Sequence, residues 1–382
     1  MWRSIASNVL TFLIVAIFLM AGVILLGQNR YREAGPLVSA ICLKVERGSN
    51  MVEVSRDLVE LQAISSGSLF RVGVKYADKE NQLKAGSFLV PADASMRDIV
   101  SIITEGGPST CGTEIVYRIG VNRLQVQVRE LDPESARFVE RLSFDPAGEV
   151  PETYAGYHSA AGTRYRIAFA EGVTSWQVVQ GLNAVDVLRG EVEALPLEGS
   201  LAPDSYEVRS GDSRESVIER MVEAQTEILN RAWESRAEGL PLDTPEEALI
   251  LASIIEKETG VAEERGQVAS VFINRLNKSI RLQTDPSVIY GITKGQGSLG
   301  RGLRQSELAR KTDWNTYVID GLPKTPIANP GRASIEAALN PDDTNFIFFV
   351  ADGTGGHAFA STLNEHNANV RKWREIEASQ NN

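Results

Sequence analysis

The feature that most constrains this chain is an uncharged apolar run close to its N-terminus. The run covers residues 9–26 and reads VLTFLIVAIFLMAGVILL, which is 18 residues without a charged side chain. At about 1.5 Å of rise per residue, a helix of roughly 20 residues spans the hydrocarbon core of a bilayer. The run is also longer than the ~7–15 apolar residues of a signal peptide. It therefore predicts an uncleaved transmembrane helix, with a cleaved signal peptide as the alternative.

The charges that flank this run do not decide its orientation. Arg3 and the terminal amine precede it, and Arg30 and Arg32 follow it, so the positive-inside rule favours neither side. We expect residues 1–8 to form a short cytoplasmic tail and residues 27–36 to form a polar linker. The rest of the chain would then lie outside the membrane.

The remaining composition is that of a globular protein with an acidic balance. Of the 382 residues, 43% are hydrophobic and 23% are charged, which is enough for a buried core. The formal net charge is -11 at pH 7. Because binding to phosphates requires clustered Lys and Arg, the sequence predicts no nucleic-acid partner. Attachment to a membrane would come from residues 9–26 and not from surface charge.

The cysteines and histidines do not form a recognisable metal motif. Cys42 and Cys111 are not part of a CxxC pair, and His158, His357 and His366 lack the spacing of zinc ligands. We therefore expect no metal and no organic cofactor. An exported domain could oxidise the two cysteines, but the sequence favours two unpaired thiols and leaves a disulfide open.

Residues 37–107 form the first predicted compact unit. A strand at 41–45 is followed by an amphipathic helix, and a strand at 86–90 is followed by a second helix that begins near Ser95. This repeated strand and helix order resembles a small LysM-like module, which would bind glycan strands. The alternative is a structural spacer.

The rest of the chain divides into a less regular segment and a longer domain. Residues 108–163 are interpreted as an insertion or a second small subdomain. A strand at 165–169 then restarts the pattern, and Thr174 fits the N-cap of the next helix. We predict a catalytic domain at 164–376 and a tail at 377–382. The predicted fold class is α+β, with an N-terminal transmembrane helix, a small LysM-like module and a helix-rich catalytic domain with a small sheet.

The strongest chemical signal lies at 242–260, which reads LDTPEEALILASIIEKETG. Thr244 fits a helix N-cap and Pro245 fits the first helical position. Most of the following positions are apolar, which predicts a helix that is buried nearly all round. This helix would deliver two carboxylates, Glu256 and Glu258, in its last turn.

The helical periodicity distinguishes these two carboxylates. At about 100° per residue, Glu258 lies roughly 50° from the centre of the apolar face and Glu256 roughly 110° from it. Glu258 should therefore be the more desolvated of the two, and desolvation raises the pKa of a carboxyl. A carboxyl that stays protonated near neutral pH can act as a general acid. The alternative is that both are solvated residues at a helix end.

Eight motifs follow one another in the second half of the chain. They are EGSLAPDSY (198–206), ASIIEKETG (252–260), VASVFINRL (268–276), RLQTDPSVIYG (281–291), NTYVIDGLP (315–323), PIANPG (326–331), FVADGTGGHAF (349–359) and EHN (365–367). Their sequences and order resemble the MltG/YceG family of endolytic lytic transglycosylases, with a looser match over 37–107. One departure is Ala202, where the family usually has an aromatic residue.

The resemblance implies a specific activity. Glu258 would be the acid/base of a peptidoglycan lytic transglycosylase, which cleaves the bond between N-acetylmuramic acid and N-acetylglucosamine and leaves 1,6-anhydro ends on nascent strands. The catalytic domain would be periplasmic, behind one anchor in the cell inner membrane, with cell-wall synthases as partners. The alternatives are a muramidase-type hydrolase, in which water attacks, and a non-catalytic glycan-binding scaffold of the synthesis machinery.

Polar residues inside the matching motifs are candidates for contacts with the glycan strand. Amide, hydroxyl and carboxylate groups can hydrogen-bond to sugar hydroxyl and acetamido groups. The candidates are Glu256, Asn274, Gln283, Thr284, Asp285, Asn315 and Tyr317. Each has a structural alternative, and for Asp285 this is capping of the helix that Pro286 starts.

Overall fold

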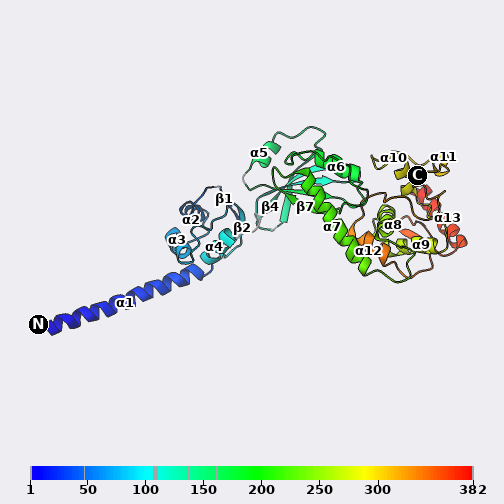
Figure 1. Cartoon of the computed structure of the whole chain (residues 1–382). Helices are drawn as coiled ribbons and strands as arrows, with labels where there is room; N and C mark the ends of the chain where they lie inside the picture. Colours follow the sequence, from blue (N-terminus) through cyan, green and yellow to red (C-terminus); the bar gives the residue numbers. More distant parts are fainter. Residues whose placement is uncertain (1, 47, 106–110, 136, 161, 381–382) are drawn as a thin grey trace. The chain divides into compact units, whose positions relative to one another are not determined.

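The computed structural model of the chain describes residues 2–46, 48–105, 111–135, 137–160 and 162–380 (Figure 1). The chain forms two compact units. The first comprises residues 1–115, 127–143 and 151–164, and the second comprises residues 116–126, 144–150 and 165–382.

The first unit begins with the long helix α1, Trp2–Arg32. Its segment Phe12–Arg32 is long and apolar enough to cross a membrane, and its most apolar stretch is not buried in the protein. Arg30 and Arg32 lie in the last turn, where positive charge is favourable to the helix dipole. The helix predicted from the apolar run is therefore confirmed as a helix.

A small α+β module follows α1 in the same unit. Strand β1, Ile41–Val45, pairs antiparallel with β2, Gly86–Val90. Its helices are α2 (Met51–Glu60), α3 (Gly67–Tyr76) and α4 (Met96–Glu105). Leu43, Leu58, Phe70 and Ile99 are at most 1% exposed and form the centre of its core. The two predicted strands and the two predicted helices, α2 and α4, are confirmed, whereas α3 was not predicted. The expected C-terminal boundary of the module at residue 107 lies outside the described residues.

A disulfide joins Cys42 of β1 to Cys111. The N–H of Cys111 donates to the carbonyl of Ser87 in β2, which brings Cys111 beside the β1–β2 pair. The Cα atoms of the two cysteines are 5.7 Å apart, within the range that a disulfide requires. The expectation of two unpaired thiols was wrong, because the partners lie 69 positions apart and no local pattern reports their contact.

The middle of the chain contributes a five-stranded sheet with the order β5-β4-β3-β6-β7. Its strands are β3 (Thr113–Ile119), β4 (Leu124–Asp132), β5 (Arg137–Phe144), β6 (Arg164–Phe169) and β7 (Ser205–Val208). The segment 108–163 therefore supplies three of the strands, and it also carries the short helix α5, Tyr154–Ser159. Strands β6 and β7 are antiparallel, with Ile167 opposite Tyr206.

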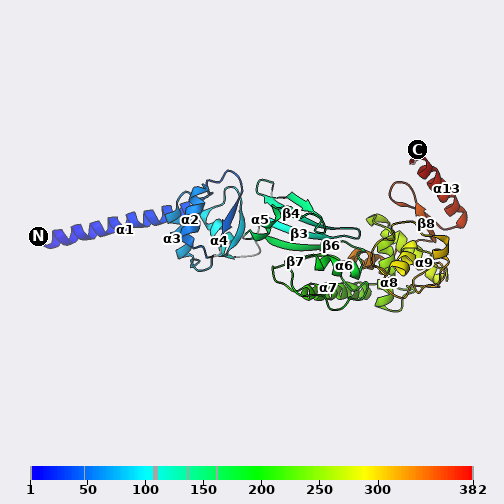
Figure 2. The ribbon, with the colours of Figure 1, turned by 90° about the horizontal axis from the view of Figure 1, so that it is seen from above.

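Two helices of the second unit, α6 (Ser175–Asn183) and α7 (Arg214–Glu234), lie along one side of strands β3, β6 and β7 (Figure 2). Thr174 caps α6 as predicted, because its hydroxyl accepts from the N–H of Gln177. Gly181 allows α6 to approach the sheet, since a Cβ there would lie 2.5 Å from the side chain of Ile119.

The core of the second unit is built from helices α8 (Pro245–Glu258), α9 (Arg265–Asn277) and α12 (Arg332–Leu339). The apolar side of α8 is fully buried, as shown by Leu251, Ile254 and Ile255 at 0% exposure. Thr244 caps α8 and Pro245 starts it, as predicted. The helix ends at Glu258, so that its last residue is the carboxylate of interest.

Shorter elements complete this unit. They are the 3₁₀ turn η1 (Ala262–Glu264), α10 (Asp285–Thr293), α11 (Gln305–Leu308), the antiparallel pair β8 (Phe348–Ala351) and β9 (His357–Ala360), and α13 (Leu363–Gln380). The predicted mixed α+β class is confirmed. The LysM-like character of the first module stays a prediction.

Candidate active site

The site is built around Glu258, the last residue of α8. The preceding apolar residues of α8 pack into the core, and the chain leaves the helix at Thr259 in an extended conformation. The Glu258 carboxylate accepts a hydrogen bond from the hydroxyl of Thr284, which directly precedes α10. The side chain is thus held at the end of a rigid helix and is contacted by a segment 26 positions further along the chain.

The surroundings of Glu258 favour its protonated form. Burial is the main cause that raises the pKa of this carboxyl above its ordinary value, and the nearby Asp285 carboxylate adds to the rise. The Thr284 hydroxyl, His357 and Arg275 lower the pKa, but they do not reverse the shift. The predicted desolvation of Glu258 is confirmed in direction.

Thr284 and Asp285 are positioned by an unusual turn. Gln283 is exposed and has a φ of 50°, which is in the left-handed region that residues other than glycine rarely adopt. The N–H of Thr284 then donates to the hydroxyl of Thr316, 3.0 Å away. Thr284 occupies the N-cap of α10 without using its side chain as a cap, which leaves its hydroxyl for Glu258.

Asp285 and Tyr317 form a pair beside the Glu258 carboxyl. The Tyr317 hydroxyl donates to the Asp285 carboxylate at 2.7 Å. Burial raises the pKa of Tyr317, and the hydrogen bond to Asp285 raises it further, so the phenol stays protonated. Asp285 is exposed and is the first residue of α10, and Thr284 occupies the N-cap position. The helix start near Pro286 is confirmed, but the alternative that Asp285 caps this helix was wrong. Asp285 is the second carboxylate that the structure brings to Glu258.

Arg275 and His357 also lie near Glu258, although neither is among the candidate residues chosen from the sequence. The Arg275 guanidinium on α9 is 8% exposed and donates to the carbonyls of Ile347 and Leu282, each at 2.7 Å. His357 on β9 contacts the carboxylate of Glu264 through Nδ1 at 2.8 Å. Arg275 breaks an otherwise apolar face of α9, and that irregularity is the one sequence signal that could have indicated its role.

Three of the candidate residues are engaged in hydrogen bonds within the protein. Glu256 accepts from the N–H of Gly331 at 3.0 Å and from the hydroxyl of Ser334 at 2.8 Å, at the start of α12. The amide of Asn274 donates to the carbonyls of Thr344 and Phe346. Asn315 is fully buried and its amide donates to three carbonyls around α11. The predicted contacts of these residues with substrate stay predictions.

A half-buried carboxylate, Glu198, was not assigned from the sequence either. It accepts from the N–H of Ser175 at 2.8 Å and from the hydroxyl of Tyr290 at 3.1 Å. Burial raises the pKa of Glu198. Through these bonds it ties the start of α6 to α10. Ala202, four residues later, is buried at 1% exposure.

The arrangement can carry out proton transfer at a single carboxyl. Glu258 has a raised pKa, a hydroxyl that fixes its orientation, and positive charge nearby that would stabilise its ionised form. Within the described part of the chain, no group of three or more His, Cys, Asp or Glu side chains could hold a metal ion.

Comparison with known proteins gives consistent matches. The model of the YceG-like family matches residues 43–372. The endolytic murein transglycosylase of Bacillus subtilis (strain 168) is 37% identical over 179 residues, which cover 47% of this chain and 48% of that protein. The endolytic murein transglycosylase of Streptococcus pneumoniae serotype 2 (strain D39 / NCTC 7466) is 26% identical over 337 residues, which cover 86% of this chain and 58% of that protein.

The chain therefore spans about half the length of the curated relatives that it matches. Among solved structures, a yceG-like protein from Listeria monocytogenes aligns with a TM-score of 0.45 at 25% sequence identity. That alignment covers 86% of this chain and 98% of the other chain.

Proposed function

The chain belongs to the YceG-like family, and on that basis we propose that it is an endolytic lytic transglycosylase of peptidoglycan with Glu258 as its acid/base. The observation that carries the proposal is the desolvated carboxyl of Glu258 at the end of the buried helix α8. The names of its relatives, endolytic murein transglycosylases, support the substrate class.

The reaction requires one carboxyl that gives up and takes back a proton. Protonated Glu258 donates its proton to the glycosidic oxygen between N-acetylmuramic acid and N-acetylglucosamine, and the bond from this oxygen to the muramyl C1 breaks. The C6 hydroxyl oxygen of the same muramyl residue then forms a bond to C1, and its proton goes to the Glu258 carboxylate. The products are an N-acetylglucosamine end and a 1,6-anhydro-muramyl end, and no water is consumed.

The surroundings of Glu258 suit both halves of this cycle. Burial raises the pKa of the carboxyl and so favours the protonated form that a general acid needs in the first step. Arg275, His357 and the Thr284 hydroxyl favour the ionised form that exists between the two steps. Because the nucleophile belongs to the substrate, its high effective concentration replaces a water that a second carboxylate would have to activate.

The first unit supports a location outside the cytoplasm. Helix α1 would anchor the chain in the cell inner membrane as a single span. The disulfide between Cys42 and Cys111 fits an oxidising compartment such as the periplasm. We propose that the module at 37–107 binds glycan in the manner of a LysM-like domain. We further propose that the chain acts on nascent strands beside cell-wall synthases, which this placement would allow.

Product analysis tests the reaction. The purified chain is incubated with isolated sacculi, and the released fragments are identified by mass spectrometry. We expect 1,6-anhydro-muramyl ends. Reducing muramyl ends would instead indicate a muramidase-type hydrolase, with Asp285 beside Glu258 as the group to examine, and intact strands would indicate a glycan-binding scaffold.

Substitution tests the assignment of the acid. Glu258→Gln keeps the shape of the side chain and removes the transferable proton, so cleavage should fall by about 10²–10⁴-fold, the usual contribution of general acid–base catalysis. The matched control is Glu246→Gln, which changes an exposed carboxylate at the other end of the same helix. Wild-type rates in the Glu258→Gln variant would refute the assignment.

A further inference from the structure

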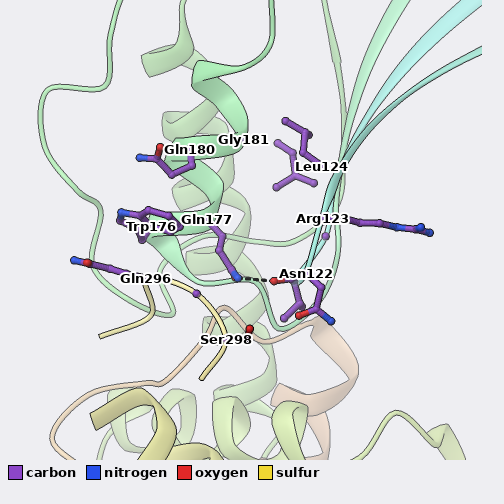
Figure 3. Close-up of a pocket in the computed structure, with 13 residues that line it drawn as sticks. Asn122, Arg123, Leu124, Trp176, Gln177, Gln180, Gly181, Gln296 and Ser298 are labelled. Carbon is purple, nitrogen blue, oxygen red and sulfur yellow. Dashed lines mark hydrogen bonds between the residues drawn. The ribbon is translucent and has the colours of Figure 1, made fainter. Parts of the chain in front are cut away.

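The second unit contains a cleft whose lining residues include neither Glu258 nor the residues that contact its carboxyl. It has a volume of approximately 500 Å³ and lies between the turn that joins β3 to β4, helix α6 and the loop that follows α10 (Figure 3). Its lining is formed by residues 119–124, by Trp176, Gln177, Gln180 and Gly181, and by residues 296–298.

Hydrogen bonds hold the three segments of this cleft together. The Gln177 amide donates to the carbonyl of Val121 at 2.6 Å, which fastens α6 to the β3–β4 turn. The hydroxyl of Thr174, the N-cap of α6, donates to the carbonyl of Gly295 at 2.6 Å, which fastens α6 to the loop after α10. The cleft is therefore formed in the free protein, as ligand pockets usually are.

The chemistry of the lining favours a neutral polar ligand. Trp176 is half-buried and offers a large aromatic surface, and the amides of Gln180 and Gln296 are exposed on the same side of the cleft in Figure 3. Among the lining residues, Arg123 alone is charged, and its side chain points away from Trp176. The lining contains no carboxylate, so the cleft can bind a sugar but cannot supply the acid that breaks a glycosidic bond.

An amino-sugar residue has the groups that this lining can recognise. Primary amides both donate and accept hydrogen bonds, as the acetamido and hydroxyl groups of N-acetylated sugars do. The face of an indole ring provides apolar contact area with little loss of side-chain entropy. A peptide stem with free carboxylates would instead be expected to face Arg or Lys side chains.

Helix α10 lies between the segment that contacts Glu258 and the segment that lines this cleft. Thr284, which donates to Glu258, directly precedes α10, and the lining residues 296–298 follow its end at Thr293. The helix has 9 residues and is therefore about 13 Å long at about 1.5 Å per residue. A glycan strand of a few sugar units covers such a separation.

We propose that this cleft is a glycan subsite, in which Trp176, Gln180 and Gln296 bind an N-acetylated sugar residue of the strand at a distance from the bond that Glu258 cleaves. The proposal rests on the proposed function and adds to it. Binding at both ends of α10 would fix where along a strand the cut falls and would favour long strands over short ones.

The test measures binding without cleavage. Full-length Glu258→Gln protein in detergent is titrated calorimetrically with peptide-free glycan strands of defined length, with and without Trp176→Ala. We expect Trp176→Ala to weaken binding of long strands about tenfold, as truncation of an aromatic anchor commonly does. Trp176→Phe should restore most of the affinity. In the chain with Glu258 intact, Trp176→Ala should raise KM for long strands with little change in kcat.

Two controls keep the outcome clear. Trp373→Ala removes a half-buried indole of α13 outside the cleft and should leave strand affinity unchanged. If Trp176→Ala lowers the melting temperature, Gln296→Ala on the exposed loop replaces it and should weaken binding in the same direction. Unchanged affinity in both cleft variants overturns the subsite. If the cleft variants weaken binding but the chain with Glu258 intact releases no anhydro ends, the subsite is retained and the proposed reaction is refuted.

Discussion

At the scale of the residue, the environment of Glu258 should lower the free energy of unfolding at neutral pH, where the proposed proton transfer takes place. Its pKa in the folded protein is raised, chiefly by burial, above the value of about 4.3 for an unfolded chain. The proton therefore binds more tightly to the folded state, and the stabilisation this gives is complete below the unfolded pKa. It is lost as the pH rises through the folded pKa, because a buried charge then remains.

Glu258→Gln should accordingly stabilise the protein while it abolishes cleavage. The neutral amide keeps an acceptor for Thr284 and carries no charge, so at pH 8 the melting temperature should rise by about 2–4 °C, equivalent to about 1 kcal/mol. Thermal unfolding is measured at pH 8 and at pH 4 for both proteins. The gain should shrink at pH 4, and a loss of stability at pH 8 would contradict a desolvated Glu258.

At the scale of the element, Glu256 acts on a helix other than its own. Its carboxylate accepts from the N–H of Gly331 and the hydroxyl of Ser334, which lie at the start of α12. A negative charge at a helix N-terminus also interacts favourably with the helix dipole. Glu256 is therefore well placed to hold α12 against α8.

Glu256→Ala should destabilise the protein by about 1–3 kcal/mol, because two donors lose a charged acceptor. We expect a lower denaturant midpoint with an unchanged slope, and unchanged kcat/KM in the protein that remains folded. Glu263→Ala, at an exposed carboxylate of η1, is the control and should have little effect. Retained stability together with lost cleavage would show that Glu256 acts on substrate, as its motif predicted.

The sequence was most informative where structure is local. Thr244, Pro245 and the apolar periodicity of α8 predict the start of this helix and its burial. The direction of the pKa shift of Glu258 was predicted from the same periodicity. These signals act within a few turns of one helix. The partners of Glu258 could not be read in the same way, because Thr284 and Arg275 reach it from α10 and α9 through tertiary packing.

The strands within 108–163 could not be predicted from local sequence patterns. Strand β5 has mainly exposed or half-buried residues without a regular alternation, so its residues give no clear period of two. Its place in the sheet is set by pairing with a neighbour and not by its own hydrophobic pattern. The cleft beside Trp176 could not be predicted from the sequence either, because its lining comes from three separate segments that tertiary packing brings together.

At the scale of the whole molecule, the disulfide and α1 both bear on the compartment in which the chain lies. The bond between Cys42 and Cys111 lies in the unit that α1 begins. Such bonds persist outside the cytoplasm, where thiols are not kept reduced. If α1 spans the membrane with its N-terminus inside, the chain that follows α1 reaches an oxidising compartment.

Cells that produce the full-length chain should therefore contain it in the oxidised form. After denaturation without reductant, a thiol-reactive polymer should add to neither cysteine, and after reduction it should add to both. The Cys42→Ser and Cys111→Ser double variant should lose about 4 kcal/mol of stability, the chain-entropy estimate for a closed loop of this length, 69 positions. Because both cysteines lie in the first unit, cleavage of soluble strands should persist in this variant. Free thiols on the protein in intact cells would contradict export of the first unit and with it the proposed orientation of α1.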